Sequence, residues 1–298
     1  MKILLLGANG QVGWELRRTL TPLGAVTTSA RSGDCDRLLD ATDFVAVAKL
    51  LDEMVPDVIV NAAAYTAVDQ AESEPDLAMR LNAELPALLG RWASGHNALV
   101  MHYSTDYVFD GTKDGPYIEA DIPSPLGVYG RSKLAGDEAL LASDCDSLIL
   151  RVSWVYGTWG NNFLLTMMRL MAECDVLRIV DDQVGTPTWC RRIAETTTEA
   201  LQRMLGAETE RDNLSGLYHF APTGETSWYS FASAIRDAGG FDCDLTPIST
   251  AEYPTLAVRP ANSRLDAGKL RHAFGITPPA WDSDLAECLA NNDGALDK

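Results

Sequence analysis

A glycine-rich turn directly after a short apolar run is the feature of this sequence that most constrains its fold. Residues 3–6 are apolar throughout and predict a strand buried on both faces, as in a parallel sheet. Gly7, Gly10 and Gly13 follow, and residues 14–20 have helical periodicity. In such a unit the glycines permit a tight turn, close approach of a diphosphate and packing of helix on strand. The pattern predicts dinucleotide binding, with a mere tight turn as the alternative.

Strand and helix patterns alternate over the first half of the chain, which is typical of a parallel α/β sheet. Further strands are predicted at 25–29, 58–60, 99–103 and 147–151, and helices at 42–54, 75–93 (with a kink at Pro86) and around 129–133. Beyond residue 152 the alternation becomes irregular. We therefore predict an α/β fold with a doubly wound, Rossmann-type sheet in residues 1–152. Residues 153–298 are expected to form mainly a smaller substrate-binding lobe, with some segments returning to the sheet.

Composition excludes several functional classes. The net charge of −18 argues against nucleic acid as a partner. Six scattered cysteines without a C-x-x-C pair indicate reduced thiols in a cytoplasmic protein, and the histidines show no metal-ligand spacing. The apolar run at the N-terminus is too short for a signal peptide or a membrane span, so no membrane association is expected.

Residues at two predicted strand ends suggest how a dinucleotide would be held. NAD-specific proteins usually place a carboxylate on the ribose 2′-hydroxyl after the second strand. Here Ala30, Arg31 and Ser32 stand in that position. A cation there favours NADP(H), with NAD(H) still possible, although Arg31 alone could also be a solvent-facing loop residue. After the strand at 58–60, small residues such as Ala62 would let a cofactor lie against the sheet.

Tyr129 and Lys133 are four residues apart in a predicted helix and share a face. An ammonium beside a phenol favours the phenolate and lowers the pKa of the phenol. Thr105 ends the strand at 99–103, at the sheet edge where ligands bind. Together the three groups predict proton transfer in ketone–alcohol chemistry, with a hydride from a cofactor. A solvent-facing Tyr–Lys pair is the alternative for this spacing alone.

The second half of the chain offers candidate substrate ligands. Residues 153–163, which include Trp154 and Asn162, are aromatic, polar and glycine-bearing and predict a pocket-lining loop, or else a buried aromatic corner. Arg259 and Arg264 are candidate ligands of a diphosphate. Surface salt bridges explain the same two arginines equally well.

The chain resembles the extended short-chain dehydrogenase/reductases over nearly its whole length, and most closely those that reduce a dTDP-linked 4-keto sugar. The similar segments are residues 10–16, 60–69, 102–111, 128–130, 133–136, 151–156, 160–163 and 262–265. The resemblance implies that Tyr129 donates a proton, that Lys133 holds the nicotinamide ribose and that Thr105 bonds the substrate. It further implies a set of ligand contacts. Gly10, Gln11 and Val12 would cradle the diphosphate, Asp40 and Ala41 would lie by the adenine, Ala64, Tyr65 and Thr66 would line the cofactor, and Thr105, Asp106 and Trp154 would contact the sugar nucleotide.

The resemblance also raises a metal and two other activities. Some members dimerise around magnesium held by carboxylates, and Glu15 matches the first of these ligands. No acid stands near Cys190, Arg191 and Arg192, where the next is expected, so these residues argue against magnesium and leave monomer or homodimer open. An epimerase or reductase of another nucleotide sugar, and a non-catalytic NADP-binding regulatory subunit, are the alternatives.

Overall fold

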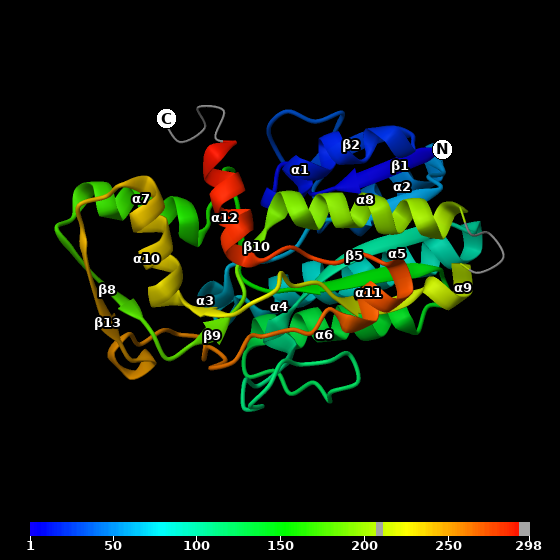
Figure 1. Cartoon of the computed structure of the whole chain (residues 1–298). Coiled ribbons are helices and arrows are strands. Elements are labelled where there is room, and N and C mark those ends of the chain that lie inside the picture. The colour runs from blue at the N-terminus through cyan, green and yellow to red at the C-terminus, as the bar shows by residue number, and fades with distance from the viewer. Residues whose placement is uncertain (207–210, 292–298) are drawn as a thin grey trace.

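The computed structural model describes residues 1–206 and 211–291, and its largest element is a parallel sheet with the strand order β11-β6-β5-β4-β1-β2-β3 (Figure 1). Its strands are β1 (Lys2–Leu6), β2 (Ala25–Ala30), β3 (Arg37–Leu38), β4 (Val58–Asn61), β5 (Leu99–Thr105), β6 (Ser147–Val152) and β11 (Gly216–His219). The order reverses at β1, between β2 and β4. In open α/β sheets the crevice for a ligand lies at the carboxyl end of such a strand. The predicted doubly wound sheet is confirmed.

Helices cover both faces of this sheet, and each face has its own hydrophobic core. Because side chains alternate along a strand, Ile3 and Leu5 of β1 point to one face and Leu4 and Leu6 to the other. The first face is covered by α1 (Gln11–Thr19), α8 (Cys190–Gly206) and α11 (Gly268–Phe274), and the second by α2 (Phe44–Met54), α5 (Leu85–His96) and α6 (Val128–Leu141). Residues 3–6 of β1 are apolar because both faces of this strand are buried.

The helical segment before β5 is interrupted earlier than the sequence predicts. It consists of α4 (Pro75–Met79), a π-helical turn η2 (Arg80–Glu84) and α5. Pro86 lies in the first turn of α5, where no backbone N–H is needed, so the expected kink at Pro86 is replaced by the wider turn before it. The helix ends at His96, because Asn97 takes a left-handed conformation with φ of 52°.

A smaller lobe stands beside the sheet, at the left of Figure 1, around a separate apolar core. It contains α7 (Phe163–Glu173), α10 (Trp228–Gly239), α12 (Trp281–Ala290) and the parallel pair β8 (Val176–Val180) and β13 (Asp244–Ile248). Two-residue strands pair nearby, β7 (Val155–Tyr156) with β10 (Thr188–Trp189) and β9 (Val184–Gly185) with β12 (Thr226–Ser227). Residues 153–163 were expected to be a loop, so β7 is a correction. The sequence offers Thr226 and Ser227 as candidate caps for a helix at 227–238, and Ser227 is the cap of α10, because its hydroxyl accepts from the backbone N–H of Ser230.

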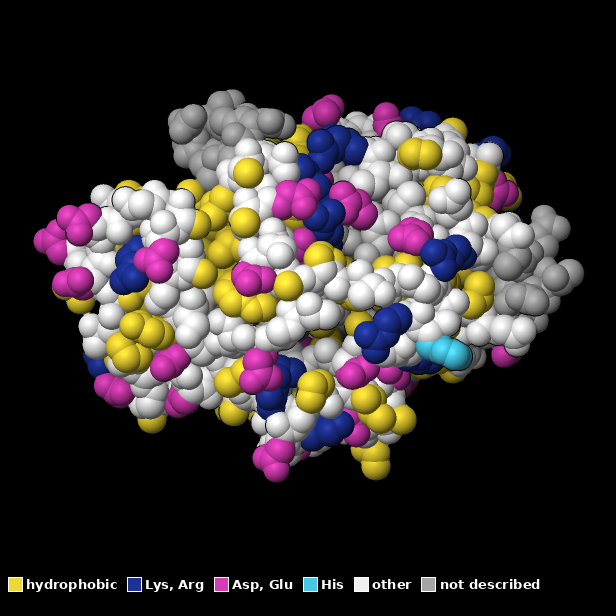
Figure 2. All heavy atoms as spheres, in the orientation of Figure 1, with side chains coloured by type: hydrophobic (Ala, Val, Ile, Leu, Met, Phe, Trp, Pro, Cys, Tyr) yellow, Lys and Arg dark blue, Asp and Glu magenta, His cyan; other side chains and the backbone are white. Residues whose placement is uncertain are grey.

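Short helices complete the described part of the chain: α3 (Val68–Ala71), α9 (Arg211–Leu214) and the 3-10 turns η1 (Thr21–Leu23), η3 (Asp106–Val108) and η4 (Thr250–Glu252). None of the described helices combines the length and apolar character needed to cross a bilayer. All six cysteines are described and have free thiols. Basic and acidic side chains are interspersed over the face shown in Figure 2.

Candidate active site

The glycine-rich turn at the carboxyl end of β1 is shaped by steric contacts that only glycine allows. Gly7 has a φ of 76°, and a Cβ on it would lie 2.5 Å from the backbone nitrogen of Ala63. A Cβ on Gly13 would lie 2.1 Å from the carbonyl oxygen of Gly7. The two glycines therefore let α1 pack directly on the turn and let the turn pack on the end of β4.

The first turn of α1 leaves its N–H groups available. Gly10 is the N-cap and has no side chain to accept from them, and the first turn contains no acidic residue. Gln11 and Val12 begin the helix at this point. Orphan N–H groups at a helix N-terminus form a binding site for an anion such as a diphosphate. The turn therefore fits a dinucleotide, both in the space that the glycines leave and in its polarity.

The segment after β2 is tied to this turn by residues that the sequence analysis did not single out. Asn9 Nδ2 donates to the carbonyl oxygen of Ser32 at 2.5 Å. The Arg17 guanidinium donates to Asn9 Oδ1 at 2.7 Å and also lies 3.4 Å from Asp34. Arg31 lies between these contacts and Asp40, and its side chain is exposed. The structure thus holds Arg31 beside the glycine-rich turn without engaging it in a described hydrogen bond.

The predicted adenine and ribose contacts lie along the ends of neighbouring strands. Asp40 accepts from the backbone and hydroxyl of Thr42, and these hydrogen bonds lower the pKa of Asp40. The segment after β4 holds Ala62, Ala64, Tyr65 and Thr66. Of the residues predicted to line the cofactor, Ala41, Ala62 and Ala64 are half-buried, Tyr65 is buried and Thr66 is exposed. Contact of these residues with a cofactor stays a prediction.

Asn82 fixes the segment after β4 and was missed by the sequence analysis. Its side chain accepts from the backbone N–H of Tyr65 at 2.8 Å and donates to the carbonyl of Tyr65 at 3.0 Å. Asn82 also donates to Ser132 Oγ on α6 at 3.0 Å. A Cβ on Gly136 would lie 2.0 Å from the Asn82 carbonyl, so α6 packs closely on the π-helical turn. Asn82 lies in the π-helical turn that interrupts the helix before β5.

Thr105 and Tyr129 come together at the carboxyl end of β5. The Thr105 hydroxyl lies close enough to the Tyr129 phenol to influence its pKa, and it donates to Asp106 Oδ1 at 3.1 Å. The Tyr107 ring packs edge-on against Tyr129, with centroids 5.5 Å apart. A Cβ on Gly130 would lie 2.1 Å from the Tyr107 carbonyl, which explains how α6 approaches the segment so closely. The phenol and the threonine hydroxyl are therefore adjacent at the ligand edge of the sheet.

Burial dominates the proton affinities of this group. It raises the pKa of Tyr129, an effect that the neighbouring Thr105 hydroxyl opposes. It lowers the pKa of Lys133 to about 8, against the opposing effect of Asp137. It also raises the pKa of Asp106 to about 6. At neutral pH the phenol therefore keeps its proton and Lys133 is mostly charged.

The Lys133 ammonium does not lie where the sequence analysis expected it. Its Nζ donates to the carbonyl oxygen of Tyr103 and lies 3.3 Å from His102 Nε2. The expected lowering of the Tyr129 pKa by Lys133 is not observed, because the ammonium is directed toward β5. His102 was missed, although a histidine inside an otherwise apolar strand was a usable signal.

A buried ion pair lies one turn further along α6. Asp137 is bonded by Arg151 of β6 at 3.1 Å and by the Ser104 hydroxyl at 2.8 Å. Both charged side chains are almost fully buried. Such a pair is costly to break because it would leave an uncompensated charge. It therefore holds α6, and with it Tyr129 and Lys133, against β5 and β6.

Trp154 lies between the lobe and the sheet in a conformation rare for a non-glycine residue, with a φ of 48°. Its indole stacks on Trp228, with ring centroids 3.6 Å apart. The Trp154 ring also packs closely on Gly185, because a Cβ on Gly185 would lie 2.6 Å from the ring. Backbone strain of this kind persists only where surrounding structure enforces it, and it is common at binding sites. The ring is half-buried and marks the lobe side of the candidate site.

The loop that follows Trp154 folds over the glycine-rich turn. Trp159 stacks on Trp14 of α1 with centroids 4.1 Å apart, and its indole N–H donates to the Asn9 carbonyl at 3.1 Å. Asn162 caps α7, because its Oδ1 accepts from the backbone of Leu165 and its Nδ2 donates to the Gly157 carbonyl. Both polar atoms of Asn162 are thus used within the chain, and substrate binding by this residue stays a prediction.

The two candidate arginines differ in their surroundings. Arg259 pairs with Asp69 at 2.6 Å, and its guanidinium lies 5.9 Å from the centre of the Tyr107 ring. Its Nη1 is buried and has no hydrogen-bond partner in the described part of the chain. Arg264 pairs with Glu225 at 2.7 Å and bonds Asn262 and the Asp114 carbonyl. Arg259 therefore has an unpartnered Nη1 beside the Tyr107 ring, whereas Nε, Nη1 and Nη2 of Arg264 each have a partner.

Glu15 is not available to a metal. Its buried carboxylate is bonded by Arg18 at 2.7 Å and by Arg191 at 3.3 Å. The neighbouring Cys190 has its pKa raised by burial, so its thiol stays protonated. Magnesium needs several oxygen ligands around an uncompensated negative charge. No cluster of three or more His, Cys, Asp or Glu side chains suited to a metal occurs among residues 1–206 and 211–291. The residues present do not fit the magnesium site.

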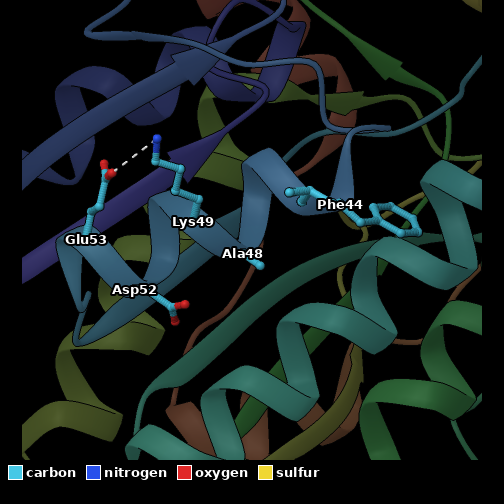
Figure 3. Close-up of a pocket in the computed structure, with 6 residues that line it drawn as sticks. Phe44, Ala48, Lys49, Asp52 and Glu53 are labelled. Atoms are coloured by element: carbon cyan, nitrogen blue, oxygen red, sulfur yellow. Dashed lines mark ion pairs between the residues drawn. The ribbon is translucent and has the colours of Figure 1, made fainter.

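A separate surface pocket lies on the outer side of α2 (Figure 3). It is lined by Phe44, Val45, Ala48, Lys49, Asp52 and Glu53, and Lys49 and Glu53 form an ion pair of 3.8 Å across it. None of these residues belongs to the glycine-rich turn or to the strand ends that carry Thr105. We therefore do not assign the candidate active site to this pocket.

A Rossmann-type sheet with a glycine-rich turn, and a Thr–Tyr–Lys group at its ligand edge, defines an NAD(P)-dependent oxidoreductase of the extended short-chain dehydrogenase/reductase class. Within that class the comparison with protein families is specific. The chain belongs to the family described as the RmlD substrate binding domain, whose model matches residues 1–293.

Several curated relatives and solved structures similar to the chain are named dTDP-4-dehydrorhamnose reductase. A dTDP-4-dehydrorhamnose reductase of Burkholderia thailandensis is 44% identical over 97% of this chain and 98% of its own length. The reductase of the same name from Salmonella typhimurium is 43% identical, with 97% of each chain covered. A crystal structure of the Clostridium acetobutylicum reductase superposes with a TM-score of 0.88 at 37% identity, covering 97% of this chain and 99% of that one. The Bacillus anthracis reductase, solved in complex with NADP, gives 0.86 at 32% identity, with 97% and 98% covered.

Proposed function

We propose that this protein reduces the 4-keto group of dTDP-4-dehydro-L-rhamnose with NADPH and so forms dTDP-L-rhamnose for cell-surface polysaccharide. The observation that carries the proposal is the placement of Thr105 beside Tyr129 at the ligand edge of the sheet, with Lys133 one helical turn further along α6. Family membership and the shared name of relatives over 40% identical supply the substrate.

The proposed chemistry divides the work among three side chains. The bound nicotinamide supplies a hydride to the substrate carbon. Tyr129 donates its phenolic proton to the oxygen at which negative charge develops, which its raised pKa and protonated state allow. Thr105 holds that oxygen against the phenol through its hydroxyl. Lys133 contributes a positive charge under the site, and its N–H groups orient the cofactor ribose.

Binding of the two ligands follows from the same geometry. The N–H groups of the first turn of α1, at Gln11 and Val12, would hold the diphosphate of the cofactor. Arg31, exposed beside this turn, would neutralise a 2′-phosphate, which supports NADPH as the preferred cofactor, with NADH also accepted. The NADP complex of the Bacillus anthracis reductase supports this choice.

We further propose that residues 153–298 supply mainly the substrate-binding lobe, with Asp106, Trp154 and Arg259 around the sugar nucleotide. The unused donor of Arg259 and the strained backbone of Trp154 support these roles. The free thiols support a cytoplasmic protein, and we propose that it acts as a monomer or homodimer.

The test is a coupled assay. Purified protein is mixed with dTDP-4-dehydro-6-deoxyglucose, the matching 3,5-epimerase and NADPH, and oxidation of the nicotinamide is followed by its absorbance. We expect oxidation only when all components are present. No oxidation with the complete mixture would contradict the proposal. Tightly bound NAD in the purified protein, with no net oxidation, would instead support an epimerase.

A further inference from the structure

A buried histidine lies directly behind Lys133, and the proposed chemistry does not use it. His102 of β5 has an exposed fraction of 1%. Its Nε2 lies 3.3 Å from Lys133 Nζ, and its Nδ1 lies 3.1 Å from the side-chain amide of Asn61 on β4. The three polar side chains therefore form a continuous row from β4 through β5 to α6, inside an otherwise apolar layer.

The donor and acceptor pattern of this row depends on the charge of Lys133. Burial, with a smaller effect of Lys133, holds the pKa of His102 well below its usual value, so the imidazole is neutral. A neutral imidazole has one donor and one acceptor nitrogen, whereas an ammonium can only donate. While Lys133 is charged, Nε2 must accept from it and Nδ1 must carry the proton. In the structure Asn61 Nδ2 faces Nδ1 and Asn61 Oδ1 accepts from the backbone N–H of Ala63 at 3.3 Å, so this tautomer requires the Asn61 amide to turn over and give up the contact with Ala63.

Few other groups favour the charged form of Lys133. Asp137 on α6 is the charged side chain that does so, and it is shared with Arg151 on β6. Tyr129 on the same helix is an uncharged phenol, β4 contributes the neutral Asn61, and β5 contributes His102 and the Tyr103 carbonyl. Burial opposes the charge. A hydrogen-bond acceptor placed against the ammonium therefore has a large influence on its protonation.

We propose that His102, held by Asn61, is a positioning residue for the reduction: it accepts a hydrogen bond from Lys133, fixes the direction of the ammonium and stabilises its charged form. With two N–H groups directed to His102 and Tyr103, the third is left for the ligand side. The inference rests on the proposed role of Lys133 in holding the cofactor. It adds that this role depends on a buried residue of β5 that lies against Lys133.

Two substitutions test the two nitrogen atoms of the His102 imidazole separately. His102→Gln can place an amide oxygen near the position of Nε2 and so keep the contact with Lys133. His102→Asn can reach the position of Nδ1 and Asn61 but not Lys133. For both variants and the wild type, NADPH affinity is measured by titration calorimetry from pH 6 to 9.5, and kcat/KM over the same range.

We expect the loss of NADPH affinity and of kcat/KM at alkaline pH to begin about one pH unit lower in His102→Asn than in the wild type. Removing an acceptor from the charged form lowers its proton affinity, and one unit corresponds to about a tenfold loss in the affected range. His102→Gln should have a midpoint close to that of the wild type. A role confined to packing would reduce activity at every pH without moving the midpoint.

An unchanged midpoint in His102→Asn overturns the inference, even if the wild type reduces the sugar. If the wild type fails to reduce the sugar, the proposed function falls, but the calorimetric midpoints still test the role of His102. Thermal unfolding at pH 6.5 checks that the variants fold. Should His102→Asn not fold, Asn61→Ala carries the test, since loss of the support for Nδ1 should move the midpoint in the same direction, and no movement contradicts the proposal.

Discussion

Individual side chains in the candidate site differ sharply in their ionisation. Burial keeps Tyr129 protonated, brings the pKa of Lys133 to about 8 and that of Asp106 to about 6. A proton donor, a cation and a titrating carboxyl group therefore belong to the same candidate site. Substitutions of Tyr129 and Asp106 test the first and the last of these groups, and a substitution of Arg31 tests the cofactor preference.

Replacing Tyr129 with phenylalanine removes the proton donor and keeps the ring that packs against Tyr107. We expect turnover to fall by about 10²–10⁴, the range typical of general acid catalysis. NADPH binding and the thermal unfolding temperature should be close to those of the wild type. The measurement is steady-state kinetics with the coupled substrate, and near-normal turnover would remove Tyr129 from its proposed role.

Replacing Arg31 with alanine tests the cofactor preference. The exposed guanidinium would pair with a 2′-phosphate, which NADH lacks, so KM should rise for NADPH and stay nearly constant for NADH. We expect a rise of about tenfold, near the lower end for a charge-assisted hydrogen bond because the site is exposed to solvent. Arg37 on β3, also exposed, is the matched control for charge. Equal changes for both cofactors would contradict the assignment.

Replacing Asp106 with asparagine tests the cost of a buried carboxyl group. Because the folded-state pKa of about 6 lies above the ordinary value of 3.8, the folded state binds more protons between these pH values. Stability of the wild type therefore falls as pH rises from about 4 to 6, and the loss persists above pH 6. Asparagine cannot ionise, so the variant should be more stable at pH 7.5, by no more than about 3 kcal/mol.

The control for this substitution is a comparison of stability at two pH values. Unfolding in urea is measured for both proteins at pH 4 and at pH 7.5. The difference in the free energy of unfolding between wild type and variant should be small at pH 4. At this pH the Asp106 side chain is protonated in the folded state and partly protonated in the unfolded state. A stability difference that does not depend on pH would show that the carboxyl group does not titrate as inferred. The variant should also bind the sugar nucleotide more weakly.

Among the secondary-structure elements, α1 contacts the turn after β1 through Gly13, which makes this position intolerant of substitution. In Gly13→Ala the new methyl group would lie 2.1 Å from the Gly7 carbonyl and push α1 away from the turn. We expect a destabilisation of about 1–3 kcal/mol, as for other overpacked sites, and loss of NADPH binding measured by calorimetry.

Gly95→Ala is the matched control, because a Cβ at this position in α5 has no neighbour within 4 Å. Replacing glycine in a helix interior should stabilise the protein by roughly 0.5–1 kcal/mol and leave NADPH binding unchanged. Equal effects of the two substitutions on NADPH affinity would show that the contact between Gly13 and Gly7 does not shape the cofactor site.

Elements with a clear period or a steric signature could be predicted from the sequence. The buried strand before Gly7, the helix of Tyr129 and Lys133 and the cap at Ser227 are of this kind. The two-residue strands of the lobe could not be, because they are too short for an alternating pattern to appear. β13 was missed because Pro247 falls inside it, which is tolerated in a strand paired on one side.

Tertiary contacts between side chains could not be predicted from the sequence either. Asn82 and His102 become meaningful only when the π-helical turn and β5 are brought against α6. The position of the Lys133 ammonium depends likewise on the Tyr103 carbonyl, which no local pattern reveals. The glycine turn and the Tyr–Lys spacing located the candidate site, but its internal hydrogen bonding required the structure.

At the level of the whole molecule, α1 and α8 are joined by apolar packing and by the ion pair of Glu15 with Arg191. Arg18 and Arg191 already neutralise Glu15 at this surface. We expect that incubation with EDTA changes neither the coupled activity nor the elution volume on gel filtration. Adding magnesium after EDTA is the control, and a magnesium-dependent recovery of either quantity would contradict this expectation.

The large sheet is completed by segments that are far apart in the chain. The face that carries α1 is also covered by α8 and α11, and β11 pairs with β6 at the edge. During synthesis on the ribosome, the apolar side chains of Ile3 and Leu5 must therefore wait for residues 190–206 and 268–274 to emerge. A nascent chain arrested after β6 would expose this face to chaperones, and the first half would not mature as an independent unit.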